Sequence, residues 1–149
     1  MRCEPPTDGT LHARYTDTIP AGQLGRNGDK LVGLWAGTYA AGTSLRQVTV
    51  SFAGTQVFDT TALPLGAGNW RVEVIVMRAS ATTARVTALG GIASTPISVA
   101  APQYATVTAS LDFATAEDLV LKGSVSSGGA TTDLVVRLAT IAWVAAAAG

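Results

Sequence analysis

The stretch Trp70–Arg78, WRVEVIVMR, decides the fold class of this chain. Every second position from its first residue is apolar, and these positions are Trp70, Val72, Val74 and Val76. Charged Arg71 and Glu73 take the first two places on the other side. Because successive side chains of a strand point to opposite faces of a sheet, this period of two predicts a strand with one buried and one outward face.

The same period recurs along most of the chain, and clusters of Gly, Ser and Asn separate the repeats. No segment keeps a helical period over the length of an ordinary helix. Strands are expected at His12–Ile19, Lys30–Ala40, Leu45–Ala53, Gln56–Thr60, Trp70–Arg78, Thr83–Leu89, Tyr104–Phe113, Asp118–Val125 and Leu134–Val144. The pattern predicts an all-β fold: a two-sheet antiparallel β-sandwich, jelly-roll-like, with about eight or nine strands.

Two connections, Thr60–Asn69 and Gly90–Pro102, are long enough that we expect each to cross from one sheet to the other. No composition shift divides the chain, which predicts a single jelly-roll domain at residues 15–149. Residues 1–14 are expected to form an extended N-terminal arm, because they carry two prolines and no regular apolar pattern.

The composition favours assembly. Charged residues make up 13% of the chain, whereas soluble domains average roughly 25%. The longest apolar run, Ile141–Ala148, is far too short for a membrane helix, and Met1–Pro6 does not resemble a secretory signal. A formal net charge of zero offers no general attraction for nucleic acid. A charge-poor, apolar chain of this kind is expected to bury surface in an oligomer, and a weakly charged monomer is the alternative.

Two strands are apolar on both sides, which points to where such an interface lies. Ile75 and Met77 continue the outward side of Arg71 and Glu73. In Leu134–Val144, three more residues are expected on the side opposite Leu134, Val136, Leu138 and Ala142, and they are Val135, Ile141 and Trp143. A strand that is apolar on both sides needs cover on both. We expect a subunit interface of a homotrimer at these five positions: Ile75, Met77, Val135, Ile141 and Trp143.

The sequence carries no pattern typical of an enzyme. His12 is the one histidine and lies near the arm, and Cys3 is the one cysteine. No His, Asp or Glu cluster has metal-ligand spacing, so no metal and no cofactor are expected. A pair of carboxylates brought together by folding stays open as an alternative.

The glycine-rich turn Gly25–Lys30, GRNGDK, leads into a strand rather than a helix, which argues against a phosphate-binding loop. Gly33 and Gly37 flank Trp35 on one side of that strand and leave room for a buried indole. Trp70 and Trp143 are also expected in the core, and carbohydrate stacking is the alternative for either one if it is exposed.

Three stretches together resemble a family of small phage virion proteins: YTDTIPAGQLGRNGDKLVGLWAGTYAAGTSLRQVTVSFAGTQVFDT at 15–60, LPLGAGNWRVEVIVMRASATTARV at 63–86 and DLVLKGSVSSGGATTDLVVRLATIAWV at 118–144. The resemblance spans roughly residues 15–144. It implies a jelly-roll domain, often trimeric, of the kind found in capsid decoration proteins, head fibres, tail fibres and spikes. The matching positions are scaffold residues, namely Pro20, Gly25, Gly28, Trp35, Gly37, Phe52, Gly54, Trp70 and Arg71. The resemblance therefore carries over no catalytic or receptor-binding residue.

Within that family, capsid decoration fits best, because only a short arm is expected before the domain. The leading hypothesis is a non-enzymatic virion protein that binds the major capsid protein on the outer capsid surface and stabilises the capsid as a trimer. The capsid-binding residues expected in the arm are Arg2, Pro5, Pro6, Leu11, His12 and Arg14. Neither nucleic acid nor membrane insertion is expected.

Two alternatives stay open. A receptor-binding tail fibre or spike head would contact tail proteins and a host glycan or protein through the loops at Gly42–Ser44, Gly66–Asn69 or Ser126–Thr132. Those loops contain no aromatic residue, which disfavours tight glycan stacking there. A polysaccharide depolymerase would need a carboxylate pair in a groove.

Overall fold

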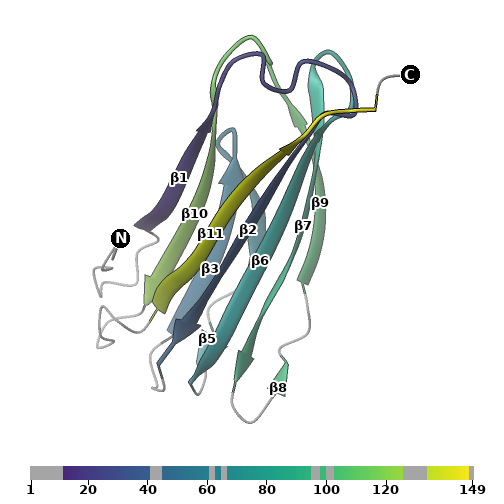
Figure 1. Cartoon of the computed structure of the whole chain (residues 1–149). Helices are drawn as coiled ribbons and strands as arrows, with labels where there is room; N and C mark the ends of the chain where they lie inside the picture. Colours follow the sequence, from purple (N-terminus) through teal and green to yellow (C-terminus); the bar gives the residue numbers. More distant parts are fainter. Residues whose placement is uncertain are drawn as a thin grey trace.

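The computed structural model describes residues 12–40, 45–60, 63–64, 67–94, 98–99, 103–125 and 134–147. The fold is all-β, with two antiparallel sheets packed face to face as a sandwich (Figure 1). The strands are β1 His12–Ile19, β2 Lys30–Tyr39, β3 Leu45–Phe52, β4 Thr55–Asp59, β5 Leu63–Pro64, β6 Gly68–Arg78, β7 Thr83–Ser94, β8 Ser98–Val99, β9 Gln103–Ser110, β10 Glu117–Val125 and β11 Leu134–Val144. Within these described residues, no helix long and apolar enough to cross a membrane occurs.

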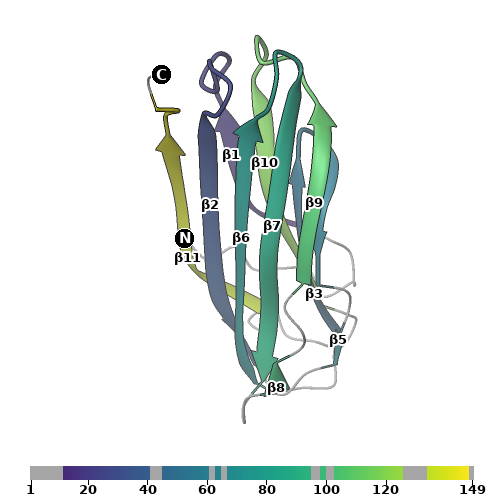
Figure 2. The ribbon, with the colours of Figure 1, turned by 90° about the vertical axis from the view of Figure 1, so that its right-hand side faces the viewer.

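The first sheet has the order β1-β10-β3-β4, with the short β5 also paired to β3. The second has the order β11-β2-β6-β7-β8, with β9 also paired to β7. Figure 2 shows the second sheet in front of the first, with β11 and β2 at one margin of the second sheet. The chain changes sheets between β1 and β2, β2 and β3, β5 and β6, β9 and β10, and β10 and β11. The two antiparallel sheets confirm the predicted all-β, two-sheet sandwich.

Only one of the two connections that were expected to cross between the sheets does so. Residues 60–69 do lead from the first sheet to the second. Residues 90–102 do not, because β7 continues to Ser94 and β9 returns along it, with Gly90 opposite Gln103 and Thr83 opposite Ser110. The glycine pair at 90 and 91 is therefore part of a strand. Gly90 has no room for a side chain, since an added Cβ would lie 2.7 Å from the Phe58 ring.

The other strand boundaries lie within a few residues of the expected ones, and the short strands β5 and β8 were not expected. β9 ends at Ser110 rather than Phe113, because Asp112 begins a turn in which its Oδ1 accepts the Ala114 N–H at 2.9 Å. β1 spans His12–Ile19 as the alternation predicts, so the end of the arm is corrected: its last three residues belong to the first sheet. There, His12 lies opposite Gly123 of β10.

The core lies between the sheets and contains the faces that alternation assigns inward. Trp35, Val72, Val74 and Val76 have no exposed surface, and Trp70 is 3% exposed. The core position predicted for Trp35 and Trp70 is thus confirmed.

Gly37 shows how tightly the second sheet is packed. A Cβ at Gly37 would overlap the Val135 carbonyl oxygen and lie 2.6 Å from the Trp70 indole nitrogen. Only a residue without a side chain lets β11 and the Trp70 ring approach β2 this closely.

β3 and β4 are joined by a two-residue hairpin. Ala53 has φ 48° and Gly54 has φ 74°, while Phe52 and Thr55 pair across the turn. Positive φ at both central residues defines a type I′ turn, whose twist matches that of the strands. Glycine adopts this conformation readily, but alanine does so at a cost.

Candidate functional site

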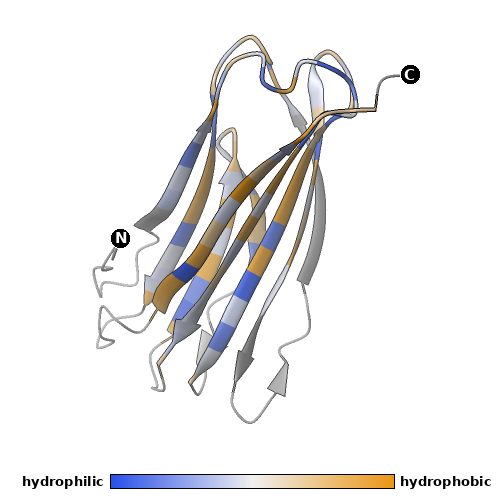
Figure 3. Cartoon of the chain, in the orientation of Figure 1, coloured by the Kyte–Doolittle hydropathy of each residue, from blue (hydrophilic) through white to orange (hydrophobic). Residues whose placement is uncertain are grey.

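The outward side of the second sheet is largely apolar across β11, β2 and β6. Directly paired residues share a face. Val32 lies between Ala142 and Ile75, and the neighbouring row has Lys30 between Val144 and Met77. We call this surface the apolar face and define it by Val32, Leu34, Ala36, Ile75, Met77, Val135, Leu138, Ala142 and Val144. Figure 3 shows β11 mostly in the hydrophobic colours.

β11 also forms a margin of this sheet. It pairs with β2 on one side and has no strand on the other among the residues described. Within its eleven residues Arg137 is the only charge. Leu138, Trp143 and Val144 are 44%, 39% and 48% exposed, and they are three of the five large apolar side chains found exposed in the described part of the chain. A long apolar strand with a free backbone edge readily pairs with other chains unless a partner covers it.

The structure corrects which residues of β11 share a face. The register shifts between Val136 and Leu138, so the alternation changes sides at Arg137. Ile141 and Trp143 therefore lie opposite Gly33 and Leu31, on the side that faces the first sheet. Of the five expected interface residues, Ile75, Met77 and Val135 belong to the apolar face, and Ile141 and Trp143 do not. A bulge in a strand that is apolar on both sides leaves no trace in the sequence, which is why the alternation misassigned them.

A groove of about 210 Å³ lies at the end of β11. It is lined by Gln23, Asp29, Lys30, Trp143, Val144 and Ala145. The expectation that Trp143 lies in the core is wrong, because it is 39% exposed on β11, at the margin of the second sheet. The other two tryptophans, Trp35 and Trp70, are buried.

Asp29 links the two sides of the groove through backbone hydrogen bonds. Its Oδ2 accepts the Arg26 N–H at 2.7 Å and its Oδ1 accepts the Ala146 N–H at 2.8 Å. These bonds tie the turn before β2 to the segment after β11. The backbone hydrogen bonds from Ala146 and Arg26 lower the pKa of the Asp29 carboxyl below its usual value, so the group is ionised at neutral pH.

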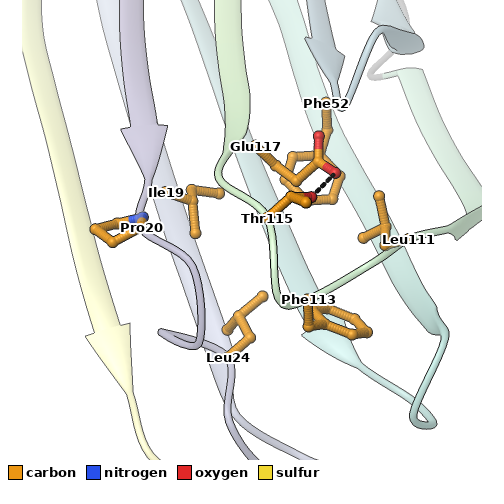
Figure 4. Close-up of a pocket in the computed structure, with 8 residues that line it drawn as sticks. All are labelled: Ile19, Pro20, Leu24, Phe52, Leu111, Phe113, Thr115 and Glu117. Carbon is orange, nitrogen blue, oxygen red and sulfur yellow. Dashed lines mark hydrogen bonds between the residues drawn. The ribbon is translucent and has the colours of Figure 1, made fainter.

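A second recess, between the ends of β1, β3 and β10, is too small for a ligand (Figure 4). Its free volume is about 10 Å³, close to the least that can hold one water molecule. The Arg78 guanidinium stacks 4.5 Å from the centre of the Phe113 ring in its lining and donates to the Leu24 carbonyl at 2.7 Å. These contacts connect Arg78, at the end of β6, to the turns that carry Leu24 and Phe113.

Arg46 is a charged residue in the core that the alternation also placed inward. It has no exposed surface, and its guanidinium carbon lies 6.0 Å from the centre of the Tyr39 ring. Burial raises the pKa of the Tyr39 hydroxyl, and the nearby Arg46 charge partly offsets this. Both groups lie inside the sandwich, away from the apolar face and the groove.

The remaining expectations fall largely outside the described residues. Arg2, Pro5, Pro6 and Leu11 lie outside them, and His12 and Arg14 lie in β1. The loops at 42–44 and 126–132 also lie outside, as does residue 66 of the third loop. Across the segments that are described, no three His, Cys, Asp or Glu residues gather as metal ligands would.

No protein-family profile, no curated protein and no solved structure matches this chain. The resemblance to phage virion proteins therefore stays a prediction that depends on the three quoted stretches.

Proposed function

We propose that this chain is a non-enzymatic structural protein of a bacteriophage particle, which forms a homotrimer through the apolar face and binds the outer surface of the capsid. The observation that carries the proposal is the apolar face together with the free edge of β11. Fully burying one Val, Leu or Ile side chain contributes about 1.5–3 kcal/mol. Most side chains of the apolar face are already half-buried, so each contributes part of this value toward offsetting an association cost of about 4–15 kcal/mol.

The border of the apolar face supports its use as an interface. Arg71 and Glu73 form an ion pair of 3.2 Å beside Ala36 and Leu34, and their side chains are 66% and 36% exposed. Lys30 lies at the other end, next to Met77 and Val144. An apolar centre with charged residues at the rim is the usual arrangement of a protein–protein interface.

Capsid stabilisation follows from mass action. A protein that binds only the assembled lattice adds its binding free energy to the cost of opening that lattice. In a trimer each subunit contributes one copy of residues 1–11, so three weak contacts act together through their effective concentration. The location on the virion and the capsid partner come from the sequence resemblance, and the trimer rests on the resemblance and on the apolar face.

Deleting residues 1–11 tests the capsid-binding segment. The deletion ends before His12, because β1 begins there and a longer deletion would remove part of the first sheet. The truncated protein should keep its oligomeric state and lose its occupancy on capsids that lack their own copy. The matched control keeps the length of residues 1–11 but scrambles their order. Equal occupancy of the truncated and intact proteins would show that this segment does not bind the capsid.

Electron cryo-microscopy of particles that carry the protein tests the location. The proposal predicts density with three-fold symmetry, repeated over the icosahedral lattice. Density at the tail alone would contradict capsid decoration and favour the receptor-binding alternative.

A further inference from the structure

The groove at the end of β11 combines the surfaces that a sugar ring needs. A pyranose presents apolar C–H groups on its faces and hydroxyl groups around its rim. Trp143 lines the groove with a partly exposed indole, a large apolar surface that also carries one N–H donor. Gln23, Asp29 and Lys30 line the same groove with an amide, a carboxylate and an ammonium group.

The carboxylate is fixed in place before any ligand arrives. Each oxygen of Asp29 already accepts one backbone N–H, at 2.7 and 2.8 Å. A carboxylate has about four lone-pair sites, so each oxygen retains capacity for a ligand hydroxyl. An acceptor held by two backbone bonds loses little freedom on binding, which favours affinity.

The polar groups also favour a ligand without net charge. Asp29 and Lys30 bring one negative and one positive group to the groove, so it offers no net attraction to an anion such as a phosphate or to a cation. The Gln23 amide is exposed and supplies both donors and an acceptor. Neutral hydroxyl groups suit this set best, since they donate to the carboxylate and accept from the ammonium and amide.

We propose that this groove binds one pyranose ring of a neutral saccharide, with the ring stacked on Trp143 and its hydroxyls bonded to Asp29, Gln23 and Lys30. The volume of about 210 Å³ lies below the roughly 300–1,000 Å³ of sites for drug-sized ligands, which suits a single ring. Trp143 and Asp29 lie outside the apolar face, whereas Val144 belongs to it and Lys30 lies at its rim, so the site adjoins the proposed subunit interface and has to stay open beside it. On a virion surface it would give the protein a weak affinity for glycans.

Saturation-transfer difference NMR on the full chain tests this site. The probes are the methyl pyranosides of glucose, galactose, mannose and N-acetylglucosamine. At least one should receive saturation from the wild-type protein, and Trp143→Ala should weaken its binding at least about tenfold through loss of stacking. Trp143→Phe should recover part of the affinity, and Gln23→Ala, on an exposed turn, should weaken binding without touching β11. Val120→Ala, on the far sheet, is the matched control and should bind as wild type.

Acrylamide quenching separates this site from an interface. The chain has three tryptophans, and Trp35 and Trp70 are buried, so quenching reports on Trp143. The proposal predicts strong quenching in the assembled state and protection on adding the bound pyranoside. It is overturned if none of the four probes receives saturation, if Trp143→Ala and Gln23→Ala bind as wild type does, or if assembly alone protects Trp143. None of these results bears on the capsid location.

Discussion

The two outward faces of the sandwich differ although the sheets share one core. On the first sheet the outward side chains are mostly polar and bond to one another. Gln47 donates to Asp59 at 2.8 Å across β3 and β4, and Thr18 donates to Asp118 at 2.7 Å across β1 and β10. On the second sheet the corresponding surface is the apolar face, where Val32 is flanked by Ile75 and Ala142.

This difference shows that the fold does not require an apolar outward face. A sandwich needs one apolar side on each sheet, and the first sheet meets only that requirement. The apolar face and the free edge of β11 exceed this requirement, and the proposed trimer would cover them. The following substitutions separate the stability of the fold from the strength of assembly.

The largest effect is expected from Ile75→Lys, on the apolar face beside Val32. In the proposed trimer it buries an unpaired charge in each subunit, and an uncompensated buried charge costs about 3–5 kcal/mol. Association should weaken at least about a hundredfold, as measured by sedimentation equilibrium.

The matched control is Val120→Lys on the polar outward side of the first sheet, where Val120 lies between Thr16 and Ser51. This variant should assemble as wild type. Equal weakening of both variants would show that the two faces do not differ in assembly.

Gly37→Ala should act on the fold instead. The new methyl group would overlap the Val135 carbonyl oxygen, which is backbone and cannot rotate away. Overpacking of this kind costs about 1–3 kcal/mol in the free energy of unfolding, measured by urea denaturation. Ser51→Ala on the outward side of the first sheet should cost less than about 0.5 kcal/mol. A Gly37→Ala variant as stable as wild type would contradict the close approach of β2 and β11.

A smaller change, and a gain, is expected from Ala53→Asn in the β3–β4 hairpin. Asparagine tolerates the positive φ of 48° better than alanine does, and Asn-Gly is a preferred pair for this turn. The free energy of unfolding should rise by about 0.5–1 kcal/mol, with no change in association. A loss of stability would show that the turn is not type I′ in solution.

The smallest effect is expected from Asp29→Asn, and it should depend on pH. Because backbone hydrogen bonds lower the pKa of Asp29 in the folded state, the carboxylate stabilises the fold at neutral pH. That contribution is lost as the pH falls from the unfolded value of 3.8 through the lowered folded pKa. Wild type should therefore melt slightly higher than the variant at pH 7, and the difference should vanish in acid. A difference that persists in acid would point to a cause other than the charge.

The strand pattern is strong enough to predict most of this fold. Every second residue of β2, β3 and β6 is assigned to the correct face, because one side of each strand is fully buried. The extension of β7 through Gly90 was missed, since its glycines serve close packing against Phe58 rather than a turn.

The candidate sites depend on contacts that alternation does not encode. The bulge at Arg137 exchanges the faces of β11, so the predicted interface mixed residues of both sides. The groove depends on Asp29 meeting Ala146, which is 117 positions away in the chain. Alternation predicts Trp143 in the core and leaves its exposure only as an alternative. The exposure follows from the position of β11 at the sheet margin, which alternation does not encode.

The solution mass of the wild-type chain tests the central claim most directly. Sedimentation velocity at micromolar concentration should give three times the chain mass of 15.1 kDa, because the apolar face is covered by neighbouring copies. A single species of 15.1 kDa under the same conditions would contradict the account and leave the apolar face without a partner subunit.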